Sequence, residues 1–259
     1  MSKQIILTAL QGLPIVKDGN DLSRLVSDGL ARENIRLASG DIIVVAQKIV
    51  SKAEGRTVDL NDVSPGARAL EIAKEIQKDP RVVELILSES KSIIRKKLGV
   101  MIVEHNRGWI MANAGIDASN VGSDGKEENV LLLPIDPEKS ATELRDALMQ
   151  RHDSDVGVVI SDSFGRPWRL GTTGVAIGAA GLPSIWDRRG EHDLFGRELQ
   201  VTQQAIADEV ATAASLLQGQ ASEGLPVVHL RGLDFSGHAS AYLRPSSDLI
   251  REASEDMFR

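Results

Sequence analysis

The chain of 259 residues has the composition of an ordinary globular protein, because 42% of its residues are hydrophobic and 26% are charged. These values exclude a disordered or collagen-like chain, and the formal net charge of −7 argues against a nucleic-acid-binding surface, which needs a basic face. There is no cysteine, which removes disulfides, zinc thiolates and cysteine nucleophiles and fits a cytoplasmic protein. The N-terminus lacks a signal-peptide pattern, and no apolar run approaches the ~20 residues of a membrane span. We therefore expect neither a nucleic acid nor a membrane as partner.

Strands and helices are predicted to mix along the whole chain, without repeats or an obvious linker. The hydrophobic pattern predicts strands at 4–9, 42–45, 100–104, 109–112, 130–134 and 156–160. It predicts helices at 22–30, 66–77, 80–88 and 201–217, and a further helix after a capping-box pattern of Ser140 and Glu143. The stretch 171–181 is rich in glycine, alanine and threonine and indicates close backbone packing. The expected fold class is mixed α/β (α+β), with no obvious domain boundary.

The common motifs of nucleotide-binding and hydrolytic enzymes are absent from the sequence. It contains no G-x-x-x-x-G-K-[ST], no G-x-G-x-x-G, no G-x-S-x-G and no H-E-x-x-H. A nucleotide site would therefore have to use an unusual motif.

The strongest local signal is the run from Ser161 to Pro167, directly after a predicted buried strand. Ligand sites in α/β proteins collect at the carboxyl ends of strands, and a carboxylate beside a hydroxyl, as in Asp162 and Ser163, suits Mg²⁺ or Mn²⁺. Arg166 and Arg169 could hold a phosphate or a carboxylate nearby. A capped turn, in which Asp162 accepts backbone hydrogen bonds, explains the same pattern about as well.

A second signal is the polar loop from Asn113 to Asn120, which contains Asp117. If Asp117 and Asp162 converge, they could bind metal ions that hold a transferring phosphoryl group, whereas an Asx-rich loop is an equally good explanation. Lys48 follows a predicted buried strand and could contact a phosphate, although a solvated strand end is the commoner role of such a lysine.

Two further segments are ambiguous. Residues 186–197 are dense in charge and contain two aromatic side chains, so they could recognise an anion, but an exposed ion-paired loop is slightly favoured. Residues 218–226 read by themselves as a helix stop and a turn. The five histidines show no spacing typical of metal ligands.

Several of these motifs occur together and in one order along the chain: Gly12-Leu13-Pro14-Ile15, Ser51-Lys52-Ala53-Glu54-Gly55-Arg56, Asn113 to Asn120, Ser161 to Arg169, and Gly219-Gln220. In this combination the sequence resembles the coenzyme F-420-0:L-glutamate ligase family, the γ-glutamyl ligases of the deazaflavin cofactor F-420. The resemblance spans about residues 5–235, nearly the whole chain.

The resemblance implies a GTP-dependent ligase that needs Mn²⁺ or Mg²⁺ and is helped by K⁺. It implies an intertwined homodimer with a non-P-loop fold, and the length of the chain allows one large domain or two lobes. The chain 1–259 would be a single ligase unit without the C-terminal nitroreductase-like domain of some members, either a stand-alone form or an excised domain.

Site residues follow from the resemblance by matching positions. The metal ligands would be Asp117, Asp162, Ser163 and Gln220, which replaces the helix-stop interpretation of Gln220. The catalytic residues would be Asp117, Asp162 and Arg166. The residues that hold GTP would be Gln11, Gly12, Leu13, Pro14, Ser39, Gly40, Lys48, Asn120, Gly219, Ala221, Ser222 and Glu223.

The implied reaction activates the terminal carboxylate of F-420-0 with GTP to an acyl phosphate, which the α-amine of L-glutamate attacks. Later rounds would activate the γ-carboxylate of the previous glutamate. Three alternatives remain open: a ligase for another carboxylate, a non-catalytic nucleotide-binding module, and a metal-dependent phosphohydrolase. Because the chain and all three substrates are acidic, we expect binding to require the divalent metal. Aromatic residues are scarce, and the rings expected to touch a ligand are Trp168, Trp186 and Phe195.

Overall fold

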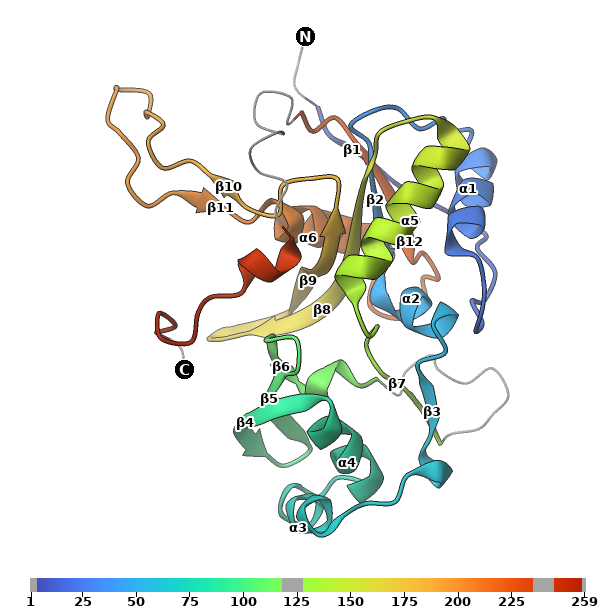
Figure 1. Cartoon of the computed structure of the whole chain (residues 1–259), viewed down its shortest axis with the longest axis vertical. Helices are drawn as coiled ribbons and strands as arrows, with labels where there is room; N and C mark the ends of the chain where they lie inside the picture. The colour runs from blue at the N-terminus through green and yellow to red at the C-terminus, as the bar shows by residue number, and fades with distance from the viewer. Residues whose placement is uncertain (1–3, 118–127, 235–244, 258–259) are drawn as a thin grey trace.

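The structure is a computed structural model that describes residues 4–117, 128–234 and 245–257. Helices and mixed sheets alternate along the chain, which confirms the predicted α+β class (Figure 1). Within the described stretches, none of the helices combines the length and the apolar composition that crossing a bilayer requires.

A five-stranded sheet forms the centre of the molecule, in the order β1-β12-β2-β8-β9. Its strands are β1 (Ile6–Ala9), β12 (Val227–Arg231), β2 (Ile42–Ala46), β8 (Gly157–Arg166) and β9 (Arg169–Ala180). β2 and β8 run parallel, so that Ala46 at the carboxyl end of β2 pairs with Ser161 in the middle of β8, and the other neighbours are antiparallel.

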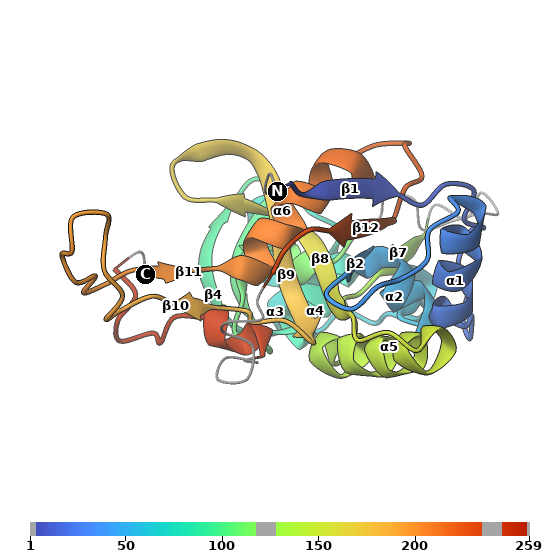
Figure 2. The ribbon, with the colours of Figure 1, turned by 90° about the horizontal axis from the view of Figure 1, so that it is seen from above.

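Helices cover both faces of this sheet. The apolar residues of β2 alternate, so that Ile43 and Val45 pack with α1 (Leu22–Arg32) and α5 (Pro137–His152), while Ile42 and Val44 pack with α6 (Ile206–Gln218). Figure 2 shows α5 and α6 on opposite sides of the strands. A strand buried on both faces reads as a continuous apolar run, which is why Ile42–Val45 was recognisable from sequence.

The segment between β2 and α5 builds a second, smaller apolar cluster. After α2 (Gln47–Ala53) come β3 (Thr57–Asp59), α3 (Ala67–Ile76), α4 (Pro80–Ser88), β4 (Ser90–Lys97), β5 (Val100–His105), β6 (Ile110–Ala112) and β7 (Asn129–Leu131). β4, β5 and β6 form a sheet that packs on α3 and α4 through Ile76, Ile86 and Met101, all fully buried. Below the central sheet in Figure 1, β3 pairs with β7 and closes the segment.

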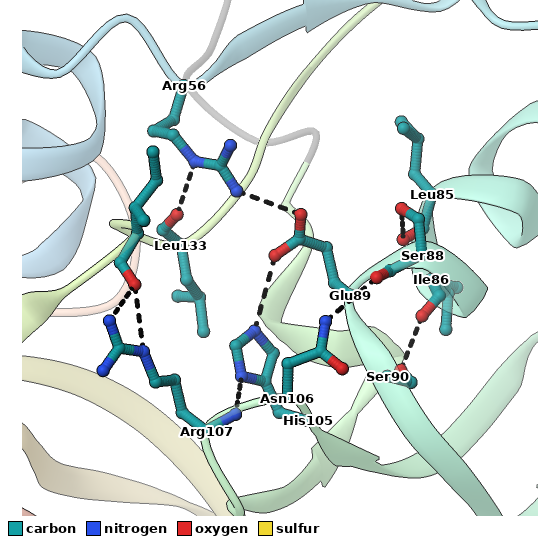
Figure 3. Close-up of polar contacts among 11 residues, drawn as sticks. Arg56, Leu85, Ile86, Ser88, Glu89, Ser90, His105, Asn106, Arg107 and Leu133 are labelled. Atoms are coloured by element: carbon teal, nitrogen blue, oxygen red, sulfur yellow. Dashed lines mark hydrogen bonds and ion pairs between the residues drawn. The ribbon is translucent and has the colours of Figure 1, made fainter.

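A polar network ties this segment to the chain that leads into α5 (Figure 3). Arg56 Nη2 lies 3.0 Å from Glu89 Oε1, and Arg56 Nε donates to the carbonyl oxygen of Leu133 at 2.9 Å. On the other side of Glu89, the buried His105 places Nε2 3.6 Å from Oε2. His105 and Arg56 together hold the pKa of Glu89 below its usual range.

Most predicted elements are confirmed, with shifted bounds, and three expectations are corrected. The capping box is wrong, because α5 begins earlier, with Pro137 in its first turn and Asp136 accepting from Lys139 N, so Ser140 lies inside the helix. α6 begins at Ile206 and not at 201, because Gln203–Gln204 forms β11 and pairs with β10 (Trp186–Asp187). β8 does not end at Ile160 but continues through Arg166 into a hairpin with β9.

Candidate active site

Five chain segments converge at one end of the central sheet. The loop after β1, α2 after β2, the segment from β6 to Asp117, the middle of β8 and the loop before β12 all line a cleft of about 1080 Å³. In Figure 1 this end faces the segment from β3 to β7. The cleft lies at the carboxyl end of β2, where its parallel pairing with β8 stops, and the carboxyl ends of parallel strands are the usual place for a ligand in an α/β sheet.

Asp162, Asp117 and Lys48 come together in this cleft. Asp162 is the residue after the buried Ser161 on β8, and it lines the cleft, where it is half-buried. Asp117 is fixed by backbone hydrogen bonds of 3.1 and 2.8 Å with Leu131 at the end of β7. Lys48 Nζ lies 2.6 Å from Asp117 Oδ2. The structure thus joins two aspartates that are 45 positions apart in the sequence.

The surroundings of Asp162 disfavour its negative charge. Burial raises its pKa to about 6, and the negative charge of Asp117 also raises it. The backbone N–H of Ser163, the nearby Lys48 and a hydrogen bond from Gln47 lower the pKa and offset part of this rise. Two carboxylates that repel each other in a half-buried cleft suit a divalent cation, because the cation would offset both their mutual repulsion and their loss of hydration. The hard oxygen atoms of this group therefore fit Mg²⁺ or Mn²⁺.

Gln220 and Ser163, also expected as metal ligands, are in contact across the cleft. Gln220 Nε2 donates to Ser163 Oγ at 2.8 Å. Gly219 ends α6 with a φ of 71°, a left-handed value that favours glycine and turns the following residues over the cleft. Ala221 and Ser222 line the cleft with Gly219 and Gln220.

Some residues expected to hold GTP flank the cleft without lining it. Leu13 and Pro14 line it, whereas Gln11 and Gly12 come earlier in the same loop, where Gln11 O accepts from Arg32 Nη1 at 3.4 Å. Glu223 folds back on its own loop, where its carboxylate accepts from the backbone N–H of Ala221 at 2.8 Å.

Ser39 and Gly40 lie at the other end of β2. Gly40 N donates to Asp155 O at 2.9 Å, and the buried Asp41 accepts from Ala38 N at 2.9 Å and from Arg231 Nη2 at 2.6 Å. The length of β2 separates this turn from the cleft, and the structure of one chain does not bring the two together.

Arg166 and Asn120 are not placed in the cleft either. Because β8 continues as a strand, Arg166 is exposed near the tip of the β8–β9 hairpin, where its Nη1 lies 3.3 Å from Gly171 O. Asn120 lies outside the described residues.

Two cleft residues were missed from the sequence, Gln47 and Lys52. Gln47 begins α2, is buried, accepts from Ser51 Oγ at 2.9 Å and hydrogen-bonds the carboxylate of Asp162. Lys52 follows Lys48 by four residues on the same helix. A helix predicted directly after the strand 42–45 would have placed Gln47 at its start. It would also have placed Lys52 on the same face as Lys48, since residues four apart share one face of a helix.

The charged segment 186–197 forms an arm outside the cleft, which confirms its favoured interpretation as an exposed, ion-paired loop. Arg188 Nη2 lies 2.8 Å from Glu191 Oε2, Arg189 pairs with Asp187, and the Arg188 guanidinium stacks 4.7 Å from the ring centre of Trp186. These ion pairs form on a projecting hairpin.

Known proteins resemble this chain over nearly its full length. A family model described as F420-0:Gamma-glutamyl ligase matches residues 12–232. The Coenzyme F420:L-glutamate ligase of Methanothermobacter thermautotrophicus is 45% identical over 257 residues, which cover 98% of this chain and 99% of the relative. The proteins of the same name from Methanocaldococcus jannaschii and Halobacterium salinarum are 42% and 41% identical and cover 95% of this chain, with 94% and 95% of the relatives. The chain therefore belongs to the F420-0:gamma-glutamyl ligase family.

Proposed function

We propose that this protein is a GTP-dependent ligase that joins L-glutamate to coenzyme F-420-0 and then adds further glutamates in γ-linkage. The observation that carries the proposal is the convergence of Asp117, Asp162 and Lys48 in one cleft of a chain from this family. The full-length similarity to proteins named Coenzyme F420:L-glutamate ligase supports the choice of substrates.

Asp117 and Asp162 would hold Mn²⁺ or Mg²⁺, with Ser163 and Gln220 beside them, and K⁺ would accompany the divalent ion. When it is bound, the metal would neutralise negative charge on the phosphate oxygens. Lys48 provides a point charge for a phosphate, held at the cleft by its contact with Asp117. The phosphates of GTP would lie at the two aspartates and Lys48, and the rest of the nucleotide would extend toward Leu13, Pro14 and the loop 219–222, which line the same cleft.

The reaction requires no side-chain nucleophile. A carboxylate oxygen of F-420-0 attacks the γ-phosphorus of GTP, the bond from that phosphorus to the bridging oxygen breaks, and GDP leaves with the electron pair. The α-amine of L-glutamate then attacks the carbonyl carbon of the acyl phosphate. The carbon–oxygen bond to phosphate breaks, inorganic phosphate leaves, and the nitrogen loses a proton to give the amide. The protein's part is to position the groups and stabilise charge.

The substitution Asp162→Asn tests the site. We expect the variant to fold but to lose GTP-dependent glutamate addition, because the amide removes the charge that would hold the metal. The measurement is the product mass after incubation with F-420-0, L-glutamate, GTP and Mn²⁺, with Asp146→Asn on the exposed face of α5 as control. A fully active Asp162→Asn variant would contradict the assignment.

The same incubation separates the alternative functions. A ligase for another carboxylate leaves F-420-0 unchanged, and a phosphohydrolase releases phosphate from GTP without glutamate. A non-catalytic module binds GTP and forms no GDP. The proposed function predicts a product whose mass grows by one glutamyl residue at a time and that requires all three substrates.

We also propose that the protein acts as a homodimer. The β8–β9 hairpin and the arm formed by β10 and β11 carry almost fully exposed apolar side chains, including Leu170, Leu194 and Phe195. Exposed apolar side chains gathered on projecting hairpins favour contact with another protein surface, and a second copy is the partner that the family resemblance implies.

A further inference from the structure

Lys52 lies in the cleft, yet neither the metal site nor the nucleotide site accounts for it. It is half-buried on α2, one helical turn after Lys48, and it belongs to the motif Ser51 to Arg56. Among the described residues that line the cleft, the basic side chains are those of Lys17, Lys48 and Lys52. Lys17 is exposed, and Lys48 contacts Asp117. Lys52 is therefore a second half-buried cation of the cleft, one helical turn after the lysine that contacts Asp117.

The position of Lys52 is electrostatically costly in the protein alone. Burial lowers the pKa of Lys52, and the nearby Lys48 lowers it further. Two lysines that lie near each other in a partly desolvated cleft are stabilised in their charged form by an anion that binds between or beside them. This end of α2 thus offers positive charge to a ligand.

The residues around Lys52 fix the helix end that carries it. Ser51 Oγ donates to Gln47 Oε1 at 2.9 Å, and both side chains are buried. Gly55 has a φ of 68° and passes so close to Asp18 that a Cβ atom would lie 2.9 Å from Asp18 Oδ1. Arg56 is anchored on Leu133 O. The ammonium group of Lys52 is therefore presented by a rigid element, which favours selective binding.

The expected carboxylate-binding residue Arg166 does not line the cleft, so another cation has to recognise the substrate carboxylates. Resting on the proposed function, we propose that Lys52 binds the γ-carboxylate of the incoming L-glutamate and so selects this amino acid. Four residues of helix rise about 6 Å. Glutamate has a four-carbon chain from its α-carbon to its γ-carboxylate, which can bridge such a distance while its amine reaches the acyl carbon beside Lys48 and Asp117.

The test compares Lys52→Met with the wild type in steady-state kinetics for each substrate. We expect the KM for L-glutamate to rise about 10-fold or more, because a charge-assisted contact is lost. The KM values for GTP and F-420-0 should stay within about twofold. The preference for L-glutamate over L-glutamine, measured as the ratio of kcat/KM values, should fall by a similar factor. Lys52→Arg should recover part of the preference, and Lys139→Met, on the exposed face of α5, is the charge-matched control.

Other outcomes overturn the inference. An unchanged KM for L-glutamate shows that Lys52 does not contact it, and a rise confined to GTP or to F-420-0 assigns the lysine to that substrate instead. Thermal unfolding and calorimetric titration of GTP with Mn²⁺ show whether Lys52→Met is folded and binds nucleotide. If the wild type makes no glutamylated product at all, the proposed function fails. If the wild type is active and Lys52→Met keeps its glutamate preference, only the role of Lys52 fails.

Discussion

At the scale of single residues, the proposed site works against the stability of the fold. Asp162 is a carboxylate whose pKa is raised to about 6, mainly by burial, whereas an unfolded chain gives aspartate a pKa of about 3.9. The folded state therefore holds a proton on Asp162 more readily than the unfolded state between these two pH values. Such a group lowers stability as the pH rises, the opposite of an ion-paired aspartate.

This fall in stability with rising pH gives a prediction for Asp162→Asn in metal-free protein. At pH 7.5 the variant should be more stable than the wild type by about 1–2 kcal/mol, a value below the full shift because the side chain keeps some solvent contact. The difference should shrink as the pH falls through about 6 and vanish below about 3.9, where the wild-type carboxyl is protonated in both states. Urea unfolding of EDTA-treated proteins across this range measures it. A wild type that is more stable than the variant at pH 7.5 would contradict the charge argument.

At the scale of elements, β9 is sandwiched between two helices that touch its backbone. A Cβ atom at Gly174 would fall well inside contact distance of the Ala211 carbonyl on α6, and one at Gly178 would fall equally close to the Pro137 carbonyl on α5. The glycines are needed for this approach and not for an unusual φ. The stretch 171–181 was expected from its composition to pack closely, and it does so from Gly174 onward, whereas Gly171 and Thr172 are exposed on the hairpin.

Replacing either glycine should force a helix away from the sheet. We expect Gly174→Ala and Gly178→Ala each to lower the free energy of unfolding by about 1–3 kcal/mol, the usual cost of overpacking. Gly165→Ala is the control, because nothing lies within 4 Å of a Cβ atom there. Thermal and urea unfolding measure the effect. If Gly174→Ala is as stable as the control, the close contact between β9 and α6 is not as tight as described.

The sequence predicted elements best where one physical signal dominated. β2 is buried on both faces and reads as an apolar run, and α1 begins after Asp21, an N-cap residue type that accepts from Arg24 N at 3.0 Å. β4 was missed because Ser90–Lys97 is polar, largely exposed and interrupted by register shifts, so it shows no clean alternation. β12 is a short apolar run directly after a turn and is recognised only by its pairing with β1 and β2.

The candidate site was predictable in its residue types and less so in its geometry. Lys48 follows β2, and Asp162 lies on β8 one residue beyond the last pair that joins the two parallel strands, so their meeting follows from the pairing of β2 with β8. Asp117 reaches them through a backbone pairing with Leu131, a long-range contact that no local pattern encodes. Arg166 was expected nearby because the strand was predicted to end at Ile160. The extra length of β8 carries it away from the cleft.

At the scale of the whole molecule, the proposed function requires an acidic chain to bind acidic ligands. The formal net charge of −7 would repel the proposed substrates GTP, F-420-0 and L-glutamate at long range, so attraction would have to come from local cations in the cleft. Lys48 and Lys52 are placed there by α2, a helix of only seven residues. The proposed divalent metal would add to them, which is why we expect substrate binding to weaken strongly when the metal is removed.

The projecting hairpins suggest how two copies would meet. Leu194 and Phe195 are 98% and 94% exposed on the arm that stands away from the body in Figure 1, and Trp168 and Leu170 are 82% and 99% exposed on the β8–β9 tip. Of only eight aromatic residues in the sequence, Trp168 and Phe195 are among these exposed side chains. Burial of such side chains against a second copy would remove their contact with water, at about 25 cal/mol per Å² of apolar surface.

We therefore expect the wild type to sediment with twice the chain mass of 27.9 kDa, and Leu194→Ser combined with Phe195→Ser to shift the protein toward the monomer. Leu98→Ser, at an exposed apolar residue in the turn between β4 and β5, is the matched control and should stay dimeric. Sedimentation velocity over a concentration series measures the equilibrium. A wild type of 27.9 kDa at all concentrations contradicts the homodimer, whereas a double variant that remains fully dimeric places the interface elsewhere. Because the arm lies outside the cleft, monomeric protein that still binds GTP would show that the nucleotide site is complete within one chain.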